Sequence, residues 1–258
     1  MIQIEALASR LFSAKQNAAP VGRITAEHMD FSLNHAYEVQ KKLLGLHLDA
    51  GETLVGRKMG LTSRPKMQQM GVNEPIHGFL TSAMQIEDGG EIAMDGRIHP
   101  KIEPEIAFLI GKKLKGRPTL AQAMAHVEGV CAAMEIIDSR YQNFEFQLPD
   151  VVADNGSSSG FVIGGQMKRP KDLDLSNLGI LVEVNGKPQL FGSSASILGH
   201  PGRSLVSLAA ILEEEGLSIP AGAVVLAGAA TAAIPLGPKQ WVRATFQGLG
   251  SVEVRVKG

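Results

Sequence analysis

The chain begins with a helical pattern of apolar residues and changes to a strand pattern near residue 54. In the first fifty residues, apolar side chains recur every three or four positions in two stretches, which predicts two amphipathic helices separated by a break at residues 17–22. From residue 54 onward, short apolar runs alternate with turns rich in glycine, aspartate and proline, as is typical of β-strands. The predicted strands are residues 54–60, 91–94, 98–110, 130–137, 161–165, 178–184, 223–228, 241–246 and 251–256.

Two more helices and one hairpin are predicted within the strand-rich part. Residues 119–126 and 204–215 have helical spacing, and Gly216 is a suitable stop for the second helix. The dipeptide Asn185-Gly186 accepts the positive φ angles of a tight hairpin turn. Because strands and helices do not alternate regularly, we predict an α+β fold, with a helical N-terminal region at residues 1–53 and a strand-rich domain at residues 54–258.

Composition narrows the function classes. The 258 residues are 44% hydrophobic and 20% charged, as in ordinary globular proteins, and the net charge of −1 with no basic stripe argues against nucleic acid as a partner. No apolar run is long enough to cross a membrane, and the first residues lack a signal-peptide pattern, so we expect a soluble cytoplasmic protein. The single cysteine, Cys131, has apolar neighbours and is expected in the core.

Three carboxylates stand in apolar stretches that are predicted as strands. Glu103 and Glu105 are two residues apart, so their side chains leave the same face of a strand, and Glu135 lies in a second apolar run. Burying a carboxylate is costly unless a cation meets it, and a set of oxygen ligands suits a hard divalent cation. The alternative is a solvated edge strand, which Pro104 between the two acids favours. Further charged residues in similar strand settings make a site the better interpretation.

Lys58 is the candidate cation beside these acids. It lies between Gly56 and Gly60 in an apolar run, and such glycines permit close approach of another group to the backbone. The ordinary interpretation is a surface lysine. Near a metal-bound anionic substrate, however, a lysine would stabilise charge or donate a proton.

Two polar stretches after residue 149 are interpreted as loops. Residues 156–160 match the G-x-S-x-G pattern of a nucleophile elbow, but a strand-like run follows where that motif needs a helix, so we treat the match as accidental. Asp150, Asp154 and Asn155 are expected to be turn residues in a loop long enough to act as a lid.

These motifs resemble the fumarylacetoacetate hydrolase superfamily, and within it the hydratases and decarboxylases of meta-cleavage pathways for aromatic compounds. The resemblance covers nearly the whole chain and rests on residues 56–63, 100–106, 135–140, 151–155, 198–201 and 248–252. It implies a mixed β-roll or sandwich with a small helical N-terminal region before the catalytic domain.

The resemblance also implies an activity, which is metal-dependent decarboxylation of 4-oxalocrotonate (2-oxo-3-hexenedioate) to 2-hydroxypenta-2,4-dienoate and CO₂. It assigns Glu103, Glu105 and Glu135 to a Mg²⁺ or Mn²⁺ site and a catalytic role to Lys58. It further implies a homo-oligomer and an association with 2-hydroxypentadienoate hydratase. The substrate-binding residues that it implies are Leu61, Thr62, Ser63, Ile76, Asp138, Arg140, Asp154 and Thr231.

Three alternatives remain open. A hydratase of the same branch would share the metal ligands, but it carries Asp where Ile76 stands, and an aliphatic side chain excludes the water that a hydratase must position. A catalytically silent partner of the hydratase is disfavoured because the three acids and Lys58 are all present. A C–C bond hydrolase would need a general base on water, and no His–Glu pair is apparent.

The chain departs from the pattern of the family at two positions. Pro104 stands where relatives usually carry Ala, which would bend the ligand strand. Ala227 stands where Thr is common before the glycine, which affects the expected role of the loop that contains Thr231.

Overall fold

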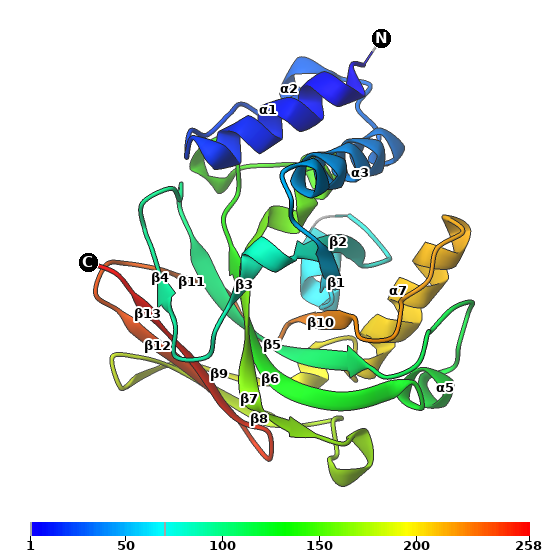
Figure 1. Ribbon diagram of the computed structural model, residues 1–258, viewed down its shortest axis with the longest axis vertical. Coiled ribbons are helices and arrows are strands. Elements are labelled where there is room, and N and C mark those ends of the chain that lie inside the picture. The colour runs from blue at the N-terminus through cyan, green and yellow to red at the C-terminus, as the bar shows by residue number, and fades with distance from the viewer. Residues whose placement is uncertain (1, 70) are drawn as a thin grey trace.

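The computed structural model of the chain describes residues 2–69 and 71–258, in which helices cover two stacked β-sheets (Figure 1). The helices are α1 (Ile4–Gln16), α2 (Ile24–Glu27), α3 (Leu33–Asp49), α4 (Arg64–Gln69), α5 (Leu120–Met124), α6 (Leu148–Ala153) and α7 (Gly202–Glu214). The strands of the larger sheet are β1 (Leu54–Gly60), β2 (Ile76–Thr81), β3 (Gln85–Ile86), β5 (Lys101–Ile110), β6 (Val127–Ile137), β7 (Ser158–Lys168), β10 (Val224–Ala229) and β11 (Ile234–Pro235). The strands of the smaller sheet are β4 (Glu91–Ile92), β8 (Gly179–Val184), β9 (Lys187–Ser193), β12 (Trp241–Phe246) and β13 (Gly250–Val256).

The larger sheet has the order β2-β1-β10-β5-β6-β7-β3, with β11 beside β5, and the smaller sheet has the order β4-β13-β12-β8-β9. Both are mixed sheets, since β1 pairs with β10 in parallel and β13 pairs with β4 in parallel while most neighbours are antiparallel. The predicted α+β class is therefore confirmed. No helix within the described ranges is long and apolar enough to cross a membrane.

Two hydrophobic cores lie on opposite faces of the larger sheet. The first core fills the space between the two sheets and includes α7, with Phe108 of β5, Phe246 of β12 and Leu208 of α7 fully buried. The second core lies under the N-terminal helices and joins Leu11 and Val39 to strand residues of the larger sheet. The face of the sheet that meets the helices is the face that carries the site.

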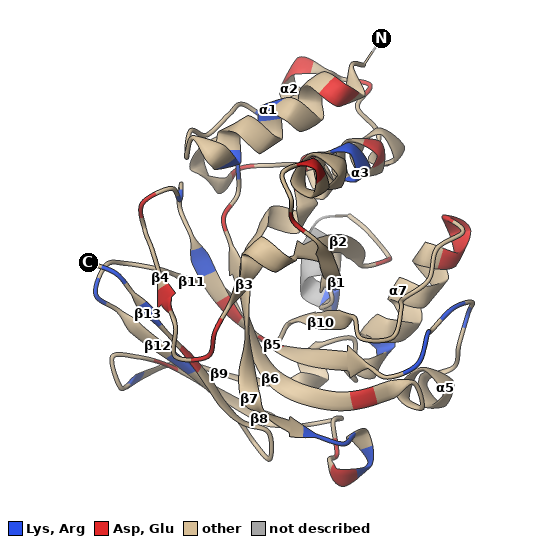
Figure 2. Cartoon of the chain, in the orientation of Figure 1, with Lys and Arg blue, Asp and Glu red and all other residues tan. Residues whose placement is uncertain are grey.

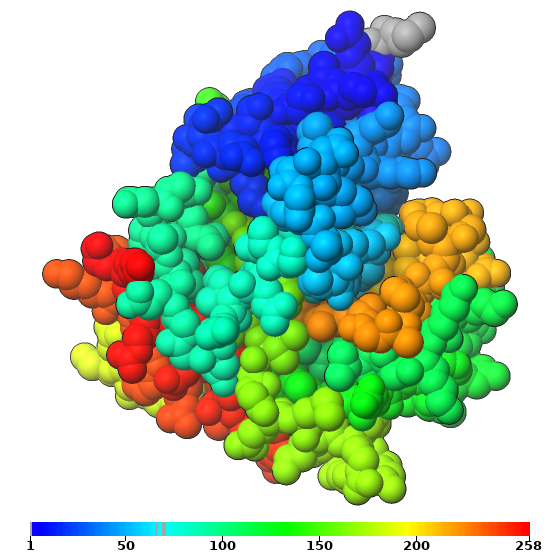
Figure 3. Space-filling model, viewed as in Figure 1, coloured from blue at the N-terminus to red at the C-terminus, as the bar shows by residue number. Residues whose placement is uncertain are grey.

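The N-terminal helices form one end of the molecule (Figure 3). Ser32 is the N-cap of α3, and its hydroxyl accepts a hydrogen bond from the amide of His35. Its buried face, which includes Ala36 and Leu43, packs into the same core as Phe79 of β2. Because this core is shared with the sheet, the division of the chain at residue 53 stays a prediction.

Charge is distributed unevenly over these elements. Lys, Arg, Asp and Glu gather on helices and loops, whereas the strands of the larger sheet are mostly uncharged (Figure 2). Buried lysine and glutamate residues inside that sheet are therefore exceptions, and they occur on β1, β5 and β6.

The register of β5 against β6 brings the predicted acids together. Glu103 is directly opposite Glu135, and Glu105 is opposite Ala133. Odd-numbered residues of both strands face the helices, because side chains alternate along a strand. Next to the acids, this face carries the small side chains of Ala133 and Ala107, which leave room for the carboxylates.

Pro104 lies in the middle of the sheet, because β5 runs between β10 and β6, and the edge-strand alternative is therefore excluded. The carbonyl of Pro104 accepts a hydrogen bond from the amide of Ala230 at 3.0 Å. In a regular ladder the amide of residue 104 would donate back to the carbonyl of Ala230. Here the hydroxyl of Ser196 lies 2.8 Å from that carbonyl and 2.7 Å from the carbonyl of Ser193, so its single proton is shared between the two. The ladder is irregular here, between Leu226 and Ala229, as expected for proline inside a sheet.

The free edge of β2 is closed by a side chain. Asn155 accepts a hydrogen bond from the amide of Phe79 at 2.7 Å and donates one to the carbonyl of Phe79 at 3.0 Å, so its amide group imitates a neighbouring strand. The carbonyl of His77 on the same edge accepts from Gln40 at 3.0 Å. These contacts satisfy buried backbone groups that would otherwise have no partner.

We expect Asn155→Ala to lower the free energy of unfolding by about 3 kcal/mol, because two buried backbone groups of Phe79 would lose their partners. Urea denaturation measures the change. Asn17→Ala, at an exposed position after α1, is the control and should stay within about 0.5 kcal/mol of the parent. An unchanged midpoint for Asn155→Ala would show that the edge does not need this side chain.

The predictions for the segment after residue 149 are partly wrong: Asp154 and Asn155 lie in a turn as predicted, but Asp150 is helical and Ser158–Gly160 are part of β7. Asp150 belongs to α6, is fully buried, and accepts hydrogen bonds from the amide and hydroxyl of Thr25. Asp154 and Asn155 are buried too, so this segment is part of the core and not a lid. Residues 155–157 form a 3₁₀ turn, and β7 begins at Ser158 without the helix that a nucleophile elbow requires.

Candidate metal centre

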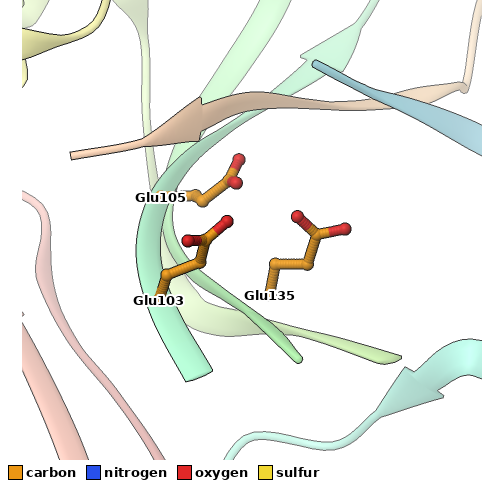
Figure 4. Close-up of side chains that lie close together, drawn as sticks. All are labelled: Glu103, Glu105 and Glu135. Carbon is orange, nitrogen blue, oxygen red and sulfur yellow. The ribbon is translucent and has the colours of Figure 1, made fainter. Parts of the chain in front are cut away.

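The carboxylates of Glu103, Glu105 and Glu135 converge on one point (Figure 4). One ligand oxygen from each residue lies within 4.8 Å of the others. Glu105 and Glu135 are 0% exposed and Glu103 is 7% exposed. Glu103 and Glu105 come from β5 and Glu135 comes from β6, so the arrangement is fixed by the register of two central strands. The prediction that these three acids lie close together is confirmed.

Three buried carboxyl groups at this short separation repel one another when ionised, and a bound cation would stabilise them. Burial raises the pKa of Glu105 well above its ordinary value, and the neighbouring charges of Glu135 and Glu103 raise it further. Lys58 and the amide of Gly228 act in the opposite direction but do not cancel the shift. In the described part of the chain, Oε1 of Glu105 and Oε1 of Glu135 have no hydrogen-bond donor. Three carboxylates with such oxygens fit a hard divalent cation such as Mg²⁺ or Mn²⁺.

Lys58 is buried beside the acids. Its Nζ lies 2.9 Å from Oε2 of Glu135 and donates to the carbonyl of Gly156 at 3.2 Å. Burial lowers the pKa of Lys58, but the charges of Glu135, Glu105 and Glu103 outweigh burial and raise its pKa above the ordinary value. The raised pKa favours the ammonium form, and the burial of Lys58 excludes the surface-lysine interpretation.

Three glycines make room for Lys58. A Cβ added at Gly156 would lie 3.2 Å from its Nζ, and one at Gly78 would lie 3.2 Å from its Cδ. A Cβ at Gly60 would lie 3.8 Å from Nζ and 3.1 Å from Cγ1 of Ile76. These glycines border the buried space that holds Lys58, which we call the lysine channel. Lys58 is the nearest group only at Gly156, since a Cβ at Gly78 would meet Asn155 at 2.6 Å and one at Gly56 would meet the Val224 carbonyl at 2.1 Å.

Ile76 lies beside this channel. It pairs with Gly60 across β1 and β2 and is buried. Because a Cβ at Gly60 would lie within 4 Å of both Ile76 and Lys58 Nζ, an aliphatic side chain stands on the same side of Gly60 as the ammonium group, where a polar residue could hold water.

The loop after β10 supports the cluster from the other side. The amide of Gly228 donates to Oε2 of Glu105 at 2.7 Å. Gly228 has φ +104°, and a Cβ there would lie only 2.1 Å from Oγ1 of Thr62, so both the backbone angle and the close contact require glycine. Thr62 is consequently held next to a backbone group that contacts Glu105.

The remaining residues of the predicted substrate site lie in two places. Leu61, Thr62 and Ser63 form the turn between β1 and α4, with Leu61 at φ +55° and the Thr62 carbonyl accepting from the amide of Leu198 at 2.8 Å. Thr231 lies in the segment that follows β10. Ala229 before it pairs with Glu105 and Ile234 after it pairs with Ile102, so this segment runs past Glu103.

Asp138, Arg140 and Asp154 form a separate buried group. Arg140 donates from Nε to Asp154, from Nη1 to the carbonyls of Asp138 and Ser158, and from Nη2 to the carbonyl of Asp154. Asp138 accepts from the amides of Ile98 and His99 at 3.0 and 2.8 Å. Burial raises the pKa of Asp154 to about 6, against the charge and hydrogen bonds of Arg140. The hydrogen bonds of these side chains connect backbone segments that are separate in sequence.

The sequence did not indicate two contacts of this site. They are the Gly228 amide on Glu105 and the Gly156 carbonyl on Lys58, and both are backbone groups brought close by folding. In the sequence, the only indication of these two contacts is that both positions are glycine.

Fold and site together define a protein with a buried carboxylate centre suited to a divalent cation, set in a mixed sheet. The family described as fumarylacetoacetate (FAA) hydrolase C-terminal matches residues 52–257. The chain belongs to this family, and the identification from sequence motifs is confirmed.

Relatives with assigned activities match almost the whole chain. A 4-oxalocrotonate decarboxylase from a Pseudomonas species is 45% identical over 257 residues, which cover 100% of this chain and 99% of that protein. A 2-hydroxyhexa-2,4-dienoate hydratase from Comamonas testosteroni is 33% identical and covers 98% of this chain and 97% of its own length. The solved 4-oxalocrotonate decarboxylase from Pseudomonas putida G7, complexed with magnesium and adipate, superposes with a TM-score of 0.96 at 41% identity and covers 98% of this chain and 97% of its own.

Proposed function

We propose that the protein is a Mg²⁺- or Mn²⁺-dependent decarboxylase that converts 2-oxo-3-hexenedioate (4-oxalocrotonate) to 2-hydroxypenta-2,4-dienoate and CO₂. The observation that carries this proposal is the buried cluster of Glu103, Glu105 and Glu135 with Lys58 beside it, together with the buried aliphatic Ile76 that pairs with Gly60 of the same strand as Lys58. The higher identity to decarboxylases than to hydratases supports the same choice.

In the proposed reaction, Glu103, Glu105 and Glu135 hold the cation. When bound, the metal supplies a Lewis acid for the 1-carboxylate and 2-oxo group of the substrate. The bond between C5 and C6 breaks, CO₂ leaves, and its electron pair moves through C4 and C3 to the oxygen on C2. The ammonium of Lys58 stabilises the negative charge that develops on that oxygen and delivers the proton that completes the 2-hydroxy group.

The other site residues receive roles by their position. We assign Leu61, Thr62, Ser63 and Thr231 to the walls of the substrate site, because their segments adjoin Glu105 or Glu103. We assign positioning roles to Asp138, Arg140 and Asp154, because their polar groups form hydrogen bonds with backbone groups and with one another.

Product analysis decides between decarboxylase and hydratase. Metal-loaded protein should release CO₂ from 2-oxo-3-hexenedioate and should hydrate 2-hydroxypenta-2,4-dienoate slowly or not at all. Hydration without CO₂ release would establish the hydratase alternative. No reaction with either compound, together with no binding of Mg²⁺ or Mn²⁺, would establish the silent-partner alternative.

Ile76→Asp should lower kcat for decarboxylation by roughly a hundredfold and create measurable hydration of 2-hydroxypenta-2,4-dienoate. The new carboxylate would pair with Lys58 and could hold and polarise a water molecule in a site that Ile76 keeps apolar. Ile76→Leu is the matched control and should keep most of the decarboxylase activity, since volume and polarity are conserved. Equal rates for the Asp and Leu variants would remove Ile76 from the choice of reaction.

We further propose a homo-oligomer in the cytoplasm that associates with a 2-hydroxypentadienoate hydratase, which would consume the product. Strand β9 ends the smaller sheet, and its Phe191 is 78% exposed, as expected for a residue covered by another subunit. Light scattering of the purified protein, alone and with a hydratase, tests both parts. A monomer under both conditions would contradict them.

A further inference from the structure

Strand β5 carries a lysine in line with two of the three clustered acids. Lys101, Glu103 and Glu105 are alternate residues of β5, and they leave the sheet on one face because side chains alternate along a strand. Glu105 is fully buried, Glu103 is 7% exposed, and Lys101 is half-buried at the start of the strand. Exposure therefore increases from the acid cluster toward Lys101, which indicates that the site opens at this end of β5.

The ammonium group of Lys101 is held by an aromatic ring. Its Nζ lies 3.8 Å from the centroid of the Phe144 ring, which is a cation–π contact. Phe144 packs in turn against the rings of His99 and Phe146, with centroid distances of 5.0 and 5.8 Å. Because the ring covers only one side of the ammonium, the N–H groups that point away from Phe144 are open to an anion.

The backbone that presents Phe144 has an unfavourable conformation. Asn143 and Phe144 have φ angles of +58° and +60°, in the left-handed region that residues other than glycine rarely adopt. Such strain persists where the surrounding structure requires it, and it is concentrated at ligand sites and active sites. Here the strained pair places the ring of Phe144 over Lys101.

The neighbouring acids do not pair with Lys101. In the ranges that the structure describes, no carboxylate lies within ion-pair distance of its Nζ. Glu103 belongs to the acid cluster, both oxygens of Asp138 accept from backbone amides, and Glu145 is exposed to water. The ammonium group therefore keeps its capacity to bind a carboxylate.

Two other cations near the acid cluster already have partners. Nζ of Lys58 lies 2.9 Å from Oε2 of Glu135. The guanidinium of Arg140 donates to Asp154 and to backbone carbonyls. On this face of β5, Lys101 is the cation that can meet a second negative charge of a substrate.

We propose that Lys101 binds the 6-carboxylate of the substrate and thereby selects a dicarboxylate. This role rests on the proposed function, because it takes the 1-carboxylate and 2-oxo group to lie at the metal centre. At the rise of a β-strand, the Cα atom of Lys101 is about 7 Å from that of Glu103, and an extended six-carbon diacid spans a similar distance.

A half-buried ammonium on an aromatic ring suits a carboxylate that must leave. The 6-carboxylate loses its charge as CO₂ forms, so a very strong contact would stabilise the ground state more than the transition state. Water screens the charge of Lys101 at the mouth of the site, which weakens the contact without removing its direction. Lys101 is therefore expected to affect substrate affinity and not the rate of bond breaking.

Isothermal titration of Mg²⁺-loaded protein tests this role with 2-oxoadipate, a dicarboxylate, and 2-oxohexanoate, which lacks the second carboxylate. The parent should bind 2-oxoadipate at least about tenfold more tightly, and Lys101→Met should lose this preference while binding 2-oxohexanoate within about twofold of the parent. Lys101→Arg should keep most of the preference, because arginine retains both the charge and the cation–π contact. Lys113→Met, at an exposed position after β5, is the matched control and should bind both probes like the parent.

Kinetics supply a second readout. Lys101→Met should raise KM for 2-oxo-3-hexenedioate about tenfold with kcat equal or higher, as expected when a ground-state contact is removed. Its melting temperature without ligand should equal that of the parent. A lysine with only a structural role would instead lower the melting temperature and weaken both probes together.

The two sets of measurements separate this role from the proposed reaction. If the parent releases no CO₂ but its preference for 2-oxoadipate disappears in Lys101→Met, the proposed reaction is refuted and the role of Lys101 is supported. If the parent releases CO₂ and Lys101→Met keeps the preference, or weakens both probes equally, the role of Lys101 is overturned.

Discussion

Glu105→Gln should reduce kcat/KM for 2-oxo-3-hexenedioate by about 10³-fold or more, because a neutral amide is a poor ligand for Mg²⁺ and several kcal/mol of Lewis-acid stabilisation would be lost. Glu105 is the fully buried member of the cluster on β5 and is positioned by the Gly228 amide, which glutamine can still bind through its carbonyl oxygen. The variant therefore removes the charge while keeping the shape of the site. Release of CO₂ measures turnover, and competition with a chelator measures metal affinity.

The same variant should have the opposite effect on the stability of the metal-free protein. Burial and the charges of Glu135 and Glu103 make ionised Glu105 unfavourable when no cation is present, so removal of its charge should leave the melting temperature equal or higher. Glu91→Gln, at an exposed position on β4, is the control for loss of one acid and should keep full turnover. Full activity of chelator-treated Glu105→Gln would refute the metal assignment.

Much of this site could be predicted from the sequence because it depends on strand periodicity. The spacing of Glu103 and Glu105 determines that they share a face, and their apolar flanks indicate burial. What could not be predicted is the register that places Glu103 opposite Glu135, since register depends on partners far along the chain. The family motifs supplied that information indirectly.

The wrong predictions occurred where side-chain hydrogen bonds replace regular structure. Asp150 and Asn155 are typical turn formers, which led to the prediction of a lid. In the fold, Asp150 binds Thr25 from the N-terminal region and Asn155 closes the edge of β2. Both partners are more than seventy residues away in sequence, so local propensity could not reveal them. Strand β2 itself was missed, although all its residues are buried.

Pro104 is explained by the same kind of distant contact. Proline lacks the amide that would complete the pair with Ala230, and the hydroxyl of Ser196 takes its place at the Ala230 carbonyl. The irregular part of β10, between Leu226 and Ala229, contains Gly228, whose amide donates to Glu105. The irregular ladder therefore helps to position a ligand of the metal centre.

Lys58→Ala should lower kcat by about 10³-fold while leaving the affinity for Mg²⁺ equal or higher. The ammonium is the charge that would stabilise the developing oxyanion, and groups in that role contribute on the order of 10² to 10⁴ in rate. Its removal also frees Oε2 of Glu135, which lies 2.9 Å from Nζ, and takes a positive charge away from the site that must bind a cation. A purely structural lysine would instead affect stability and metal binding together.

A comparison of Lys58→Arg with Lys58→Ala separates the need for positive charge from the need for the shape of lysine. Lys58→Arg keeps the charge, but a longer planar guanidinium must fit where Nζ already lies 2.9 Å from Glu135 and 3.2 Å from the Gly156 carbonyl. This variant should therefore also lose activity and should melt at a lower temperature than Lys58→Ala. Lys112→Ala, on the exposed turn after β5, is the control and should keep parental kcat. If Lys58→Ala retains parental kcat, the proton and charge must come from another group, and the role of the lysine is confined to neutralising Glu135.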